Sequence, residues 1–400
     1  MRKFIPFILI LFILAALLRI DFFFTILYLF VGIYVLSHLW LSRTFSQLEI
    51  SRTLQQRAFW GEKIPVTLKL KNQSRLPILW LMLHEVFPLT LSSPSFFRQV
   101  ITLAGKASHT VHYSLTARKR GYYQIGPLTL HGGDLLDLKQ TQTHSLKADE
   151  LIVYPKIVSI SRLTLPTHSP QVILPTPMPL FQDPARPIGV RDYTPGDNPR
   201  HIHWTATAAT GQMLVKQFQP AIARDNAIFL NLSRPDYARR GHPESAIELA
   251  ITVAASLANH IAIFEELPLG LITTALDPLA GRQQQCKLPP RKGRDYLIQI
   301  LEVLARVQPV ETGSHFLEDV RREAVHLSWG TTIIVITSHQ SEALSTMLLF
   351  LKRSGFQVAL VLVDLVRAYR KMREEPIKSL DLPIFKIRQE KDIEVWSPTR

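Results

Sequence analysis

The sequence AIFLNLSRP, residues 227–235, decides the fold of the C-terminal half of the chain. It begins with a short run, Ala227 to Leu232, that is apolar except for one asparagine, and such a run is typical of a strand buried on both faces. Comparable runs follow at 267–276, 332–337 and 357–363, separated by helical stretches at 244–264, 295–307 and 342–354. This alternation predicts a parallel sheet covered on both faces, in an α/β domain over residues 221–400.

Upstream of this domain, residues 191–204 read RDYTPGDNPRHIHW. The Pro-Gly pair in the middle is typical of a turn, and Asp197 can accept hydrogen bonds just beyond it. Arg191 and Arg200 bracket this acid, which favours a charge-assisted clamp across the turn. Two interpretations stay open. The segment is a docking surface for a partner or an anionic ligand, or it is a structural clamp that holds the preceding connector on the next domain.

This segment, within residues 189–220, resembles the defining motif of the bacterial family called domain of unknown function number 58. The residues that would bind a partner or form the clamp are Arg191, Tyr193, Pro195, Gly196, Asp197, Arg200, Trp204 and Lys216. Further matches are Ile202, Gly211, Val215 and, upstream, Arg120, Gly121, Tyr122, Tyr123, Gly126, Pro127 and Asp134. Three positions depart from the motif: His203 replaces the usual Asp, Thr205 the usual Lys, and Ala209 the usual Arg.

The resemblance also implies a von Willebrand factor A-like (Rossmann-type) fold, whose metal site uses Asp-x-Ser-x-Ser after the first strand and an Asp after a later one. The corresponding positions are Asn231, Ser233, Pro235 and Ser338. A divalent cation needs anionic oxygen ligands, so we expect a degenerate site with no metal and no cofactor. Asp236 and Asp277 would substitute only if the loops bend unusually, although Arg234 and the two serines remain available for a partner.

The chain lacks the motifs of common enzyme classes. There is no phosphate-binding Gly-rich loop with a lysine, no His-Glu-x-x-His and no nucleophile elbow. Ser233 and His339 lie at the ends of two predicted strands and leave a hydrolase as an alternative, but no acid is evident that would orient the histidine. We therefore expect a protein that is not an enzyme.

Seven prolines lie between Leu163 and Pro187. Proline lacks an N–H donor and restricts the residue before it, so this density excludes a regular helix. Residues 161–188 are predicted to form an extended connector. Before it, residues 44–160 alternate between apolar and polar side chains, as in Val66, Leu68 and Leu70. Short strands at intervals of ~10 residues favour an all-β domain, an immunoglobulin-like β-sandwich.

Two apolar stretches, residues 4–18 and 22–41, open the sequence and predict a transmembrane helical hairpin over residues 1–43. A signal peptide is the alternative, but no small-residue cleavage site follows the first stretch. Basic residues flank both ends, and the positive-inside rule then places the chain in the bacterial inner membrane, multi-pass, with its soluble domains in the cytoplasm. The single cysteine, Cys286, fits a reducing compartment.

The net charge of +14 is compatible with nucleic acid, anionic lipid or the cytoplasmic bias of a membrane protein. The basic residues are scattered and are not interleaved with aromatic ones, unlike those of single-strand binders. We predict no binding of nucleic acid, which stays an alternative that a steep salt dependence would reveal.

These features predict a membrane-anchored scaffold or adaptor whose partners are proteins and, through the N-terminal helices, membrane lipid. The family resemblance implies cooperation with a MoxR-type AAA ATPase, and in some cases with a transglutaminase-like membrane protein, in the assembly or maturation of a complex. The ATPase would supply the energy and this chain the membrane-tethered surface.

Overall fold

The computed structural model describes most of the chain. The described residues are 10, 12–13, 17, 21–88, 90–91, 95–133, 140–161, 163, 182–194, 197, 199–220, 225–238, 242–311, 315–338, 341–363 and 382–396. Most of the first predicted span (4–18), most of the connector, Asp134, Pro195, Gly196 and His339 lie outside them. The chain divides into two compact units, which are Met1–Lys156 with Leu301–Val307, and Ile157–Ile300 with Gln308–Arg400.

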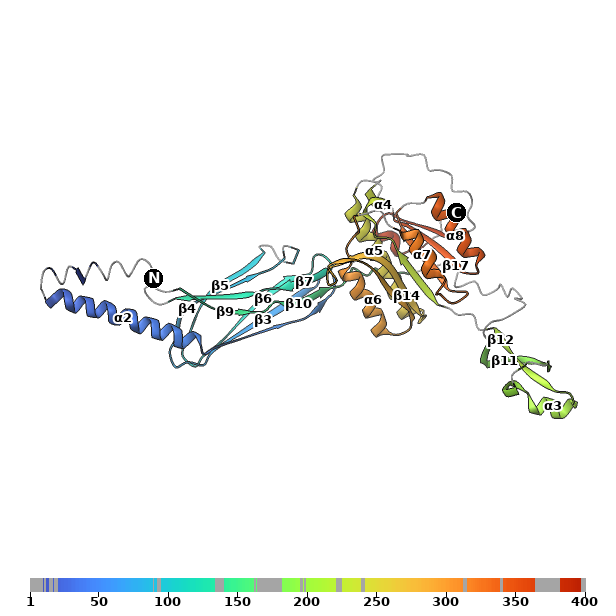
Figure 1. The fold of residues 1–400 in the computed structure, drawn as a ribbon, viewed down its shortest axis with the longest axis horizontal. Helices are drawn as coiled ribbons and strands as arrows, with labels where there is room; N and C mark the ends of the chain where they lie inside the picture. Colours follow the sequence, from blue (N-terminus) through green and yellow to red (C-terminus); the bar gives the residue numbers. More distant parts are fainter. Residues whose placement is uncertain are drawn as a thin grey trace. The chain divides into compact units, whose positions relative to one another are not determined.

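The first unit combines a long helix with three β-sheets (Figure 1). The sheets have the strand orders β1-β3-β6, β2-β10-β7 and β5-β4-β8-β9. The elements are α2 (Asp21–Phe45), β1 (Leu48–Leu54), β2 (Arg57–Ala58), β3 (Lys63–Asn72), β4 (Ile78–Val86), β5 (Phe96–Leu103), β6 (Ser108–Thr116), β7 (Gly121–Ile125), β8 (Leu128–Gly133), β9 (Gln140–Leu146) and β10 (Asp149–Val153).

Strand β3 shows why this region folds as sheets. Its buried side chains alternate with exposed or half-buried ones, so that Val66, Leu68 and Leu70 lie on one face, as the period of two predicts. β3 pairs antiparallel with both β1 and β6. The predicted β-rich region is therefore present.

Helix α2 is long and apolar enough to cross a membrane, and most of its apolar side chains are exposed or half-buried. Only its last turns are fixed in the β-rich core, where Leu41 and Phe45 are buried among β-strand residues. A Cβ atom at Gly132 would lie 2.0 Å from the Phe45 ring, so this close approach requires glycine. The Trp40 indole also donates a hydrogen bond to the Pro77 carbonyl at 2.9 Å. The end of the helix is therefore firmly attached to the first unit.

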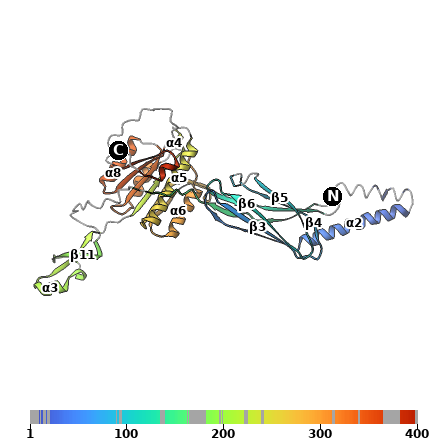
Figure 2. The same ribbon diagram turned by 180° about the vertical axis from the view of Figure 1, so that it is seen from behind.

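The second unit contains a six-stranded sheet with the order β15-β14-β13-β16-β17-β18 (Figures 1 and 2). Its elements are β11 (Gln182–Asp192), η2 (Pro199–His201), α3 (Trp204–Thr210), β12 (Leu214–Pro220), β13 (Asn226–Leu230), α4 (Arg234–Ala238), α5 (Pro243–Asn259), η3 (His260–Phe264), β14 (Leu269–Asp277), β15 (Arg282–Arg291), α7 (Phe316–Ala324), β16 (Thr332–Thr337), α8 (Glu342–Arg353), β17 (Gln357–Val363), β18 (Ile384–Ile387) and η4 (Glu390–Ile393). Helix α6 (Arg294–Arg306) begins in this unit.

Helices cover both faces of the sheet. Phe229 and Val335 belong to a core cluster with residues of α7 and α8, which pack against each other. The alternate residues Ile228 and Ile334 point to the opposite face and are also buried, and α5 contacts β13, β16 and β17. With η3, α5 is long and apolar enough to cross a membrane, but it is largely buried as a core helix of this unit.

The mixed α/β class is confirmed, and three details of the prediction are wrong. First, the sheet is not entirely parallel, because β15 runs antiparallel to β14. Only residues 278–281 join these strands, and such a short connection permits only antiparallel pairing. Second, α4, α7, β15 and β18 had not been predicted. Third, β11 begins at Gln182, inside the predicted connector, where pairing with β12 supplies hydrogen bonds despite two prolines.

Candidate functional site

The signature residues form a β-hairpin with a helical insertion. β11 and β12 pair antiparallel, with Val190 opposite Lys216 and Arg191 opposite Val215. The connection between them contains η2 and α3. Just beyond β11, the Tyr193 N–H donates to the carbonyl of Met213, which directly precedes β12, at 2.9 Å. We call residues 189–217 the signature hairpin.

An ion pair fixes the turn of the signature hairpin. Arg191 donates from Nη1 and Nη2 to the two carboxylate oxygens of Asp197, at 2.7 and 2.5 Å. The backbone N–H and the hydroxyl of Thr194 donate to the same carboxylate, each at 2.9 Å. The hydrogen bond from Arg191 and those from Thr194 hold the pKa of Asp197 well below its usual range. Arg200 lies exposed in η2. The predicted clamp geometry therefore exists between Arg191 and Asp197.

Helix α3 begins at a histidine cap. The Nδ1 atom of His203 accepts a hydrogen bond from the Ala206 N–H at 3.2 Å, which is the usual role of an Asp side chain at the start of a helix. Gly211 ends the helix in a left-handed conformation, with φ of 72°. The Leu214 N–H donates to the Thr207 hydroxyl at 3.1 Å and joins α3 to β12. The departure from the family motif at His203 thus preserves the cap.

The signature hairpin exposes three large apolar side chains among its described residues. Ile202 and Val215 bridge one another and are buried. Trp204, Met213 and Val190 are 66%, 52% and 43% exposed. An exposed tryptophan on an element with fixed ends is suited to contact with another molecule.

A second polar cluster lies at the carboxyl ends of β13 and β16. The amide nitrogen of Asn231 donates to the Asp236 carboxylate at 2.8 Å and to the Thr337 hydroxyl at 3.2 Å. The amide oxygen of Asn231 accepts the Ser233 N–H at 3.0 Å. The neutral amide therefore joins the two strand ends directly.

The position of Asp236 corrects the sequence analysis, which expected this acid to reach the site only through an unusual loop. Helix α4 begins at Arg234, and its first turn brings Asp236 back to Asn231. An acid in the first turn of a helix that follows a strand was the signal for this position. Even so, the described part of the chain holds no group of three or more His, Cys, Asp or Glu side chains placed to bind a metal. Asp277 instead accepts hydrogen bonds from Leu279 and Gln284 in the β14–β15 hairpin.

The remaining residues of this cluster are mostly engaged. Ser338 donates its hydroxyl to the Asp236 carbonyl at 2.6 Å, and Arg234 pairs with Glu311 at 2.6 Å and with Glu244 at 3.1 Å. Pro235 is exposed in α4. Ser233 is 1% exposed, and its hydroxyl has no hydrogen-bond partner among the described residues. This burial weighs against Ser233 as a nucleophile, because a substrate has no access to it.

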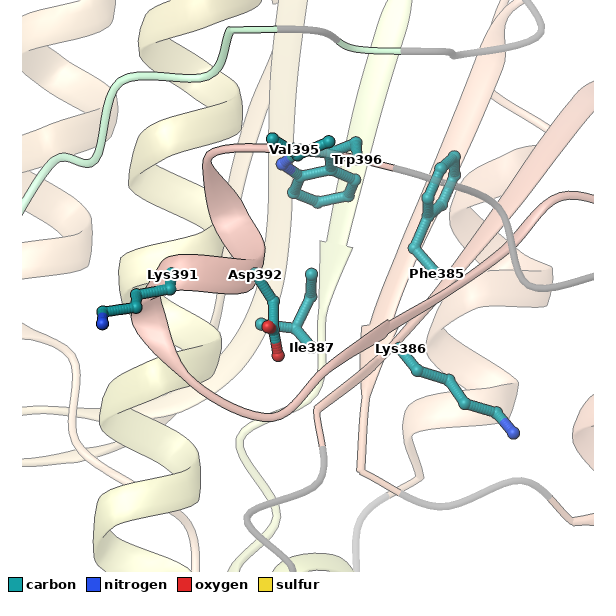
Figure 3. A pocket seen from close by; sticks show the side chains of 7 residues that line it. All are labelled: Phe385, Lys386, Ile387, Lys391, Asp392, Val395 and Trp396. Atoms are coloured by element: carbon teal, nitrogen blue, oxygen red, sulfur yellow. The ribbon is translucent and has the colours of Figure 1, made fainter.

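A pocket of about 240 Å³ lies beside η4 (Figure 3). The residues that line it are Phe385, Lys386, Ile387, Lys391, Asp392, Val395 and Trp396. Asp392 accepts the N–H groups of Arg388 and Gln389 at 2.7 and 3.1 Å, and Trp396 donates to the Ile393 carbonyl at 2.7 Å. Its two lysines point away from each other (Figure 3). The pocket therefore lacks a convergent set of groups for a ligand.

Residues 189–366, from within β11 to just beyond β17, match the family model described as "Protein of unknown function DUF58". The chain carries a DUF58 domain. The matched part of this domain includes the signature hairpin and the strand ends around Asn231. The chain is also similar to "Uncharacterized protein YeaD" of Bacillus subtilis (strain 168), with 23% identity over 206 residues, which are 50% of this chain and 49% of that protein. The chain thus spans about half the length of this relative.

Similarities to solved structures are weak. A β-glucosidase from Listeria innocua matches 26% of this chain and 16% of its own, with 16% identity and a TM-score of 0.19. The CARDB domain of a Pyrococcus furiosus protein matches 26% of this chain and 86% of its own, with 8% identity and a TM-score of 0.21. TM-scores this low say nothing about the fold or function of this chain.

Proposed function

We propose that this chain is a membrane-anchored adaptor. Helix α2 holds it in the bacterial inner membrane with the soluble units in the cytoplasm, and the signature hairpin binds a protein partner. The partner that the family resemblance favours is a MoxR-type AAA ATPase. The chain contributes recognition, and the chemistry belongs to the partner.

The observation that carries this proposal is the exposed apolar surface of the signature hairpin. Burial of a tryptophan side chain contributes on the order of 2 kcal/mol to association, and tryptophan and arginine dominate the energetic centres of protein interfaces. Trp204 is presented by a helix whose start is capped, close to a turn held by the Arg191–Asp197 pair. Such preorganisation lowers the entropy that binding must overcome.

Each of the two units has a role in the proposed adaptor. We infer that the β-rich unit is an immunoglobulin-like sandwich that serves as a spacer next to the membrane. We also infer that the sheet of the second unit is von Willebrand factor A-like and that its usual cation is replaced by the contacts of Asn231. Partner binding would then proceed without a divalent cation.

Site-specific photocrosslinking tests the proposal. The full-length chain, with a photoreactive phenylalanine analogue in place of Trp204, is expressed in its host, and a MoxR-type AAA ATPase of the same organism is detected in the crosslinked product. We expect a crosslink from position 204 and none from Thr346, which is exposed on α8. Purified in mild detergent, Trp204→Ala should bind the ATPase at least tenfold more weakly than the unmodified chain.

Trp329→Ala is the matched control, because Trp329 is a comparably exposed tryptophan of the same unit. It should bind the ATPase like the unmodified chain. Equal binding by Trp204→Ala would contradict the role of the hairpin. A complete lack of binding by the unmodified chain would contradict the choice of partner.

A further inference from the structure

The second unit carries a further surface, at the edge of the sheet where the parallel strands begin. Thr332 of β16 and Gln357 of β17 are paired in register, so the segments that precede them lie side by side at this edge. These segments follow α7 and α8, which pack against each other on one face of the sheet. The C-terminal ends of both helices therefore lie at the same edge. We call residues 321–331 and 349–356 the α7–α8 end.

The α7–α8 end exposes large apolar side chains. Val325, Trp329 and Phe350 are 80%, 55% and 54% exposed. Leu349, which directly precedes Phe350, is also exposed. Trp329 is held in place although it is exposed. A Cβ atom at Gly355 would lie 2.1 Å from its indole nitrogen, so the indole lies directly on the backbone of the turn after α8. Trp329, in the segment after α7, thus contacts the turn that follows α8.

The same end is basic. Its exposed cationic or titratable side chains include Arg321, His326, Lys352 and Arg353. The α7–α8 end contains one acid, the buried Glu323, and this acid pairs with Lys287 of β15. The acids of α7 and α8 that lie in the first turns, Glu318, Asp319 and Glu342, are at the opposite ends of the helices. Asp225, just before β13, is the acid on the neighbouring strand, where its carbonyl accepts the Thr332 N–H. Positive charge and exposed apolar side chains therefore coincide.

We propose that the α7–α8 end docks on an anionic lipid surface. Aromatic and aliphatic side chains enter the interface between headgroups and acyl chains, while lysine and arginine stay at the phosphate level. Tryptophan prefers this interface, and each basic residue near an anionic leaflet adds to the attraction. A protein partner fits less well, because the centres of protein interfaces are depleted in lysine.

The inference rests on the part of the proposed function that places α2 in a bilayer, and not on the signature hairpin. Because α2 belongs to the same chain, it keeps the lipid at a high effective concentration. Weak contacts of the α7–α8 end are then sufficient. Docking would bring the second unit to the membrane surface that holds the anchor.

Hydrogen exchange of the full-length chain in nanodiscs tests the inference. One set of discs contains phosphatidylcholine alone, and the other contains phosphatidylcholine with about a third phosphatidylglycerol, enough to give the surface a strong negative potential. We expect amides of residues 325–331 and 349–356 to exchange at least threefold more slowly in the anionic discs. The difference should disappear in Lys352→Glu/Arg353→Glu and shrink in Trp329→Ala.

Arg118→Glu/Lys119→Glu changes the net charge equally at an exposed site of the first unit and should keep the protection. Equal exchange in the two kinds of disc would overturn the inference, and so would protection in both, which indicates a protein contact such as a second copy. Failure of the chain to enter discs at all would instead refute the anchoring by α2. Trp204→Ala should keep the protection, which separates this surface from the hairpin.

Discussion

At the scale of single residues, the neutral amide of Asn231 joins two strand ends. Its amide donates to a carboxylate and to a hydroxyl, so it offsets the negative charge of Asp236 without a cation. A carboxylate in the same position would face Asp236 at hydrogen-bond distance. Two such acids cannot both ionise without repulsion unless a cation or a proton lies between them.

Asn231→Asp should therefore be unstable in the absence of divalent cations. We expect a loss of about 2 kcal/mol at neutral pH, from the lost donor and the added repulsion, and partial recovery in millimolar Mg²⁺. Thermal unfolding of the full-length chain in detergent, with a chelator or with Mg²⁺, measures both effects. Asn231→Ala removes the same hydrogen bonds without a new charge and should not respond to Mg²⁺. Identical behaviour of the two variants would refute this explanation.

The same residues show how far sequence reasoning reaches. Asn231, Ser233 and Ser338 follow the ends of β13 and β16, because a short apolar run predicts the strand, although the predicted run to Leu232 extends two residues beyond the end of β13 at Leu230. Asp236 was set aside because its distance from Asn231 depends on the turn of α4. The apolar pattern of a sequence does not predict in which direction the backbone turns after a strand ends. The Arg191–Asp197 pair could be predicted because the two residues are only six positions apart in the sequence.

At the scale of elements, an ion-pair network fastens the edge strand β15 to helix α7. Lys287 of β15 pairs with Glu323 of α7 at 2.5 Å, and Arg322 pairs with Asp319 at 2.6 Å. Asp319 also accepts the Thr274 hydroxyl of β14 at 2.6 Å. Burial alone would raise the pKa of Glu323, but the hydrogen bonds and charges of Lys287 and Arg322 outweigh it, and the pKa is lowered.

A carboxyl group with a lowered pKa in the folded state stabilises the fold above its unfolded pKa, and this contribution is lost as the pH falls through the folded value. The ion-pair network between β15 and α7 should therefore stabilise the fold at neutral pH and lose this effect in acid. Glu323→Gln should lower the stability at pH 7 by about 1–2 kcal/mol and reduce the further loss on acidification. Urea unfolding at pH 7 and at pH 4 measures this. Glu318→Gln, at an exposed position of the same helix, is the control. If the free energy of unfolding changes with pH equally in Glu323→Gln and the unmodified chain, the ion-pair network does not stabilise the fold in this way.

Strand β15 and helix α7 were not predicted from the apolar pattern of the sequence, and the structure gives the reason. β15 alternates only weakly, with Cys286 as its buried residue, because an edge strand needs little apolar surface. Helix α7 has only nine residues, and its apolar stripe of Phe316, Val320 and Ala324 is too short to stand out. The central strands, buried on both faces, were recognisable from composition alone.

At the scale of the whole molecule, one short segment of the first unit lies, in the sequence, within the second unit. Leu301–Val307 belongs to the first unit, although the residues on both sides belong to the second. Within the first unit, the buried guanidinium of Arg120 donates to the carbonyls of Leu304, Ala305 and Val307 at 2.8, 3.0 and 2.9 Å. These carbonyls lie at the end of α6, where a helix has no partners of its own for them. Nothing in the linear pattern connects positions so far apart.

Arg120→Ala should therefore destabilise the first unit strongly. Three carbonyls would lose a charged donor in a buried setting, which costs on the order of 3 kcal/mol. Hydrogen exchange of residues 301–307 should accelerate with it, whereas that of the buried part of α5 should not change. Arg118→Ala, at an exposed position two residues away, should leave both quantities unaltered. Arg120→Lys keeps the charge, but its nitrogen lies one bond nearer the backbone than the Nη1 atom that donates to all three carbonyls, so it should recover only part of the stability. If Arg120→Ala unfolds like the unmodified chain, apolar contacts alone hold the segment 301–307 to the first unit.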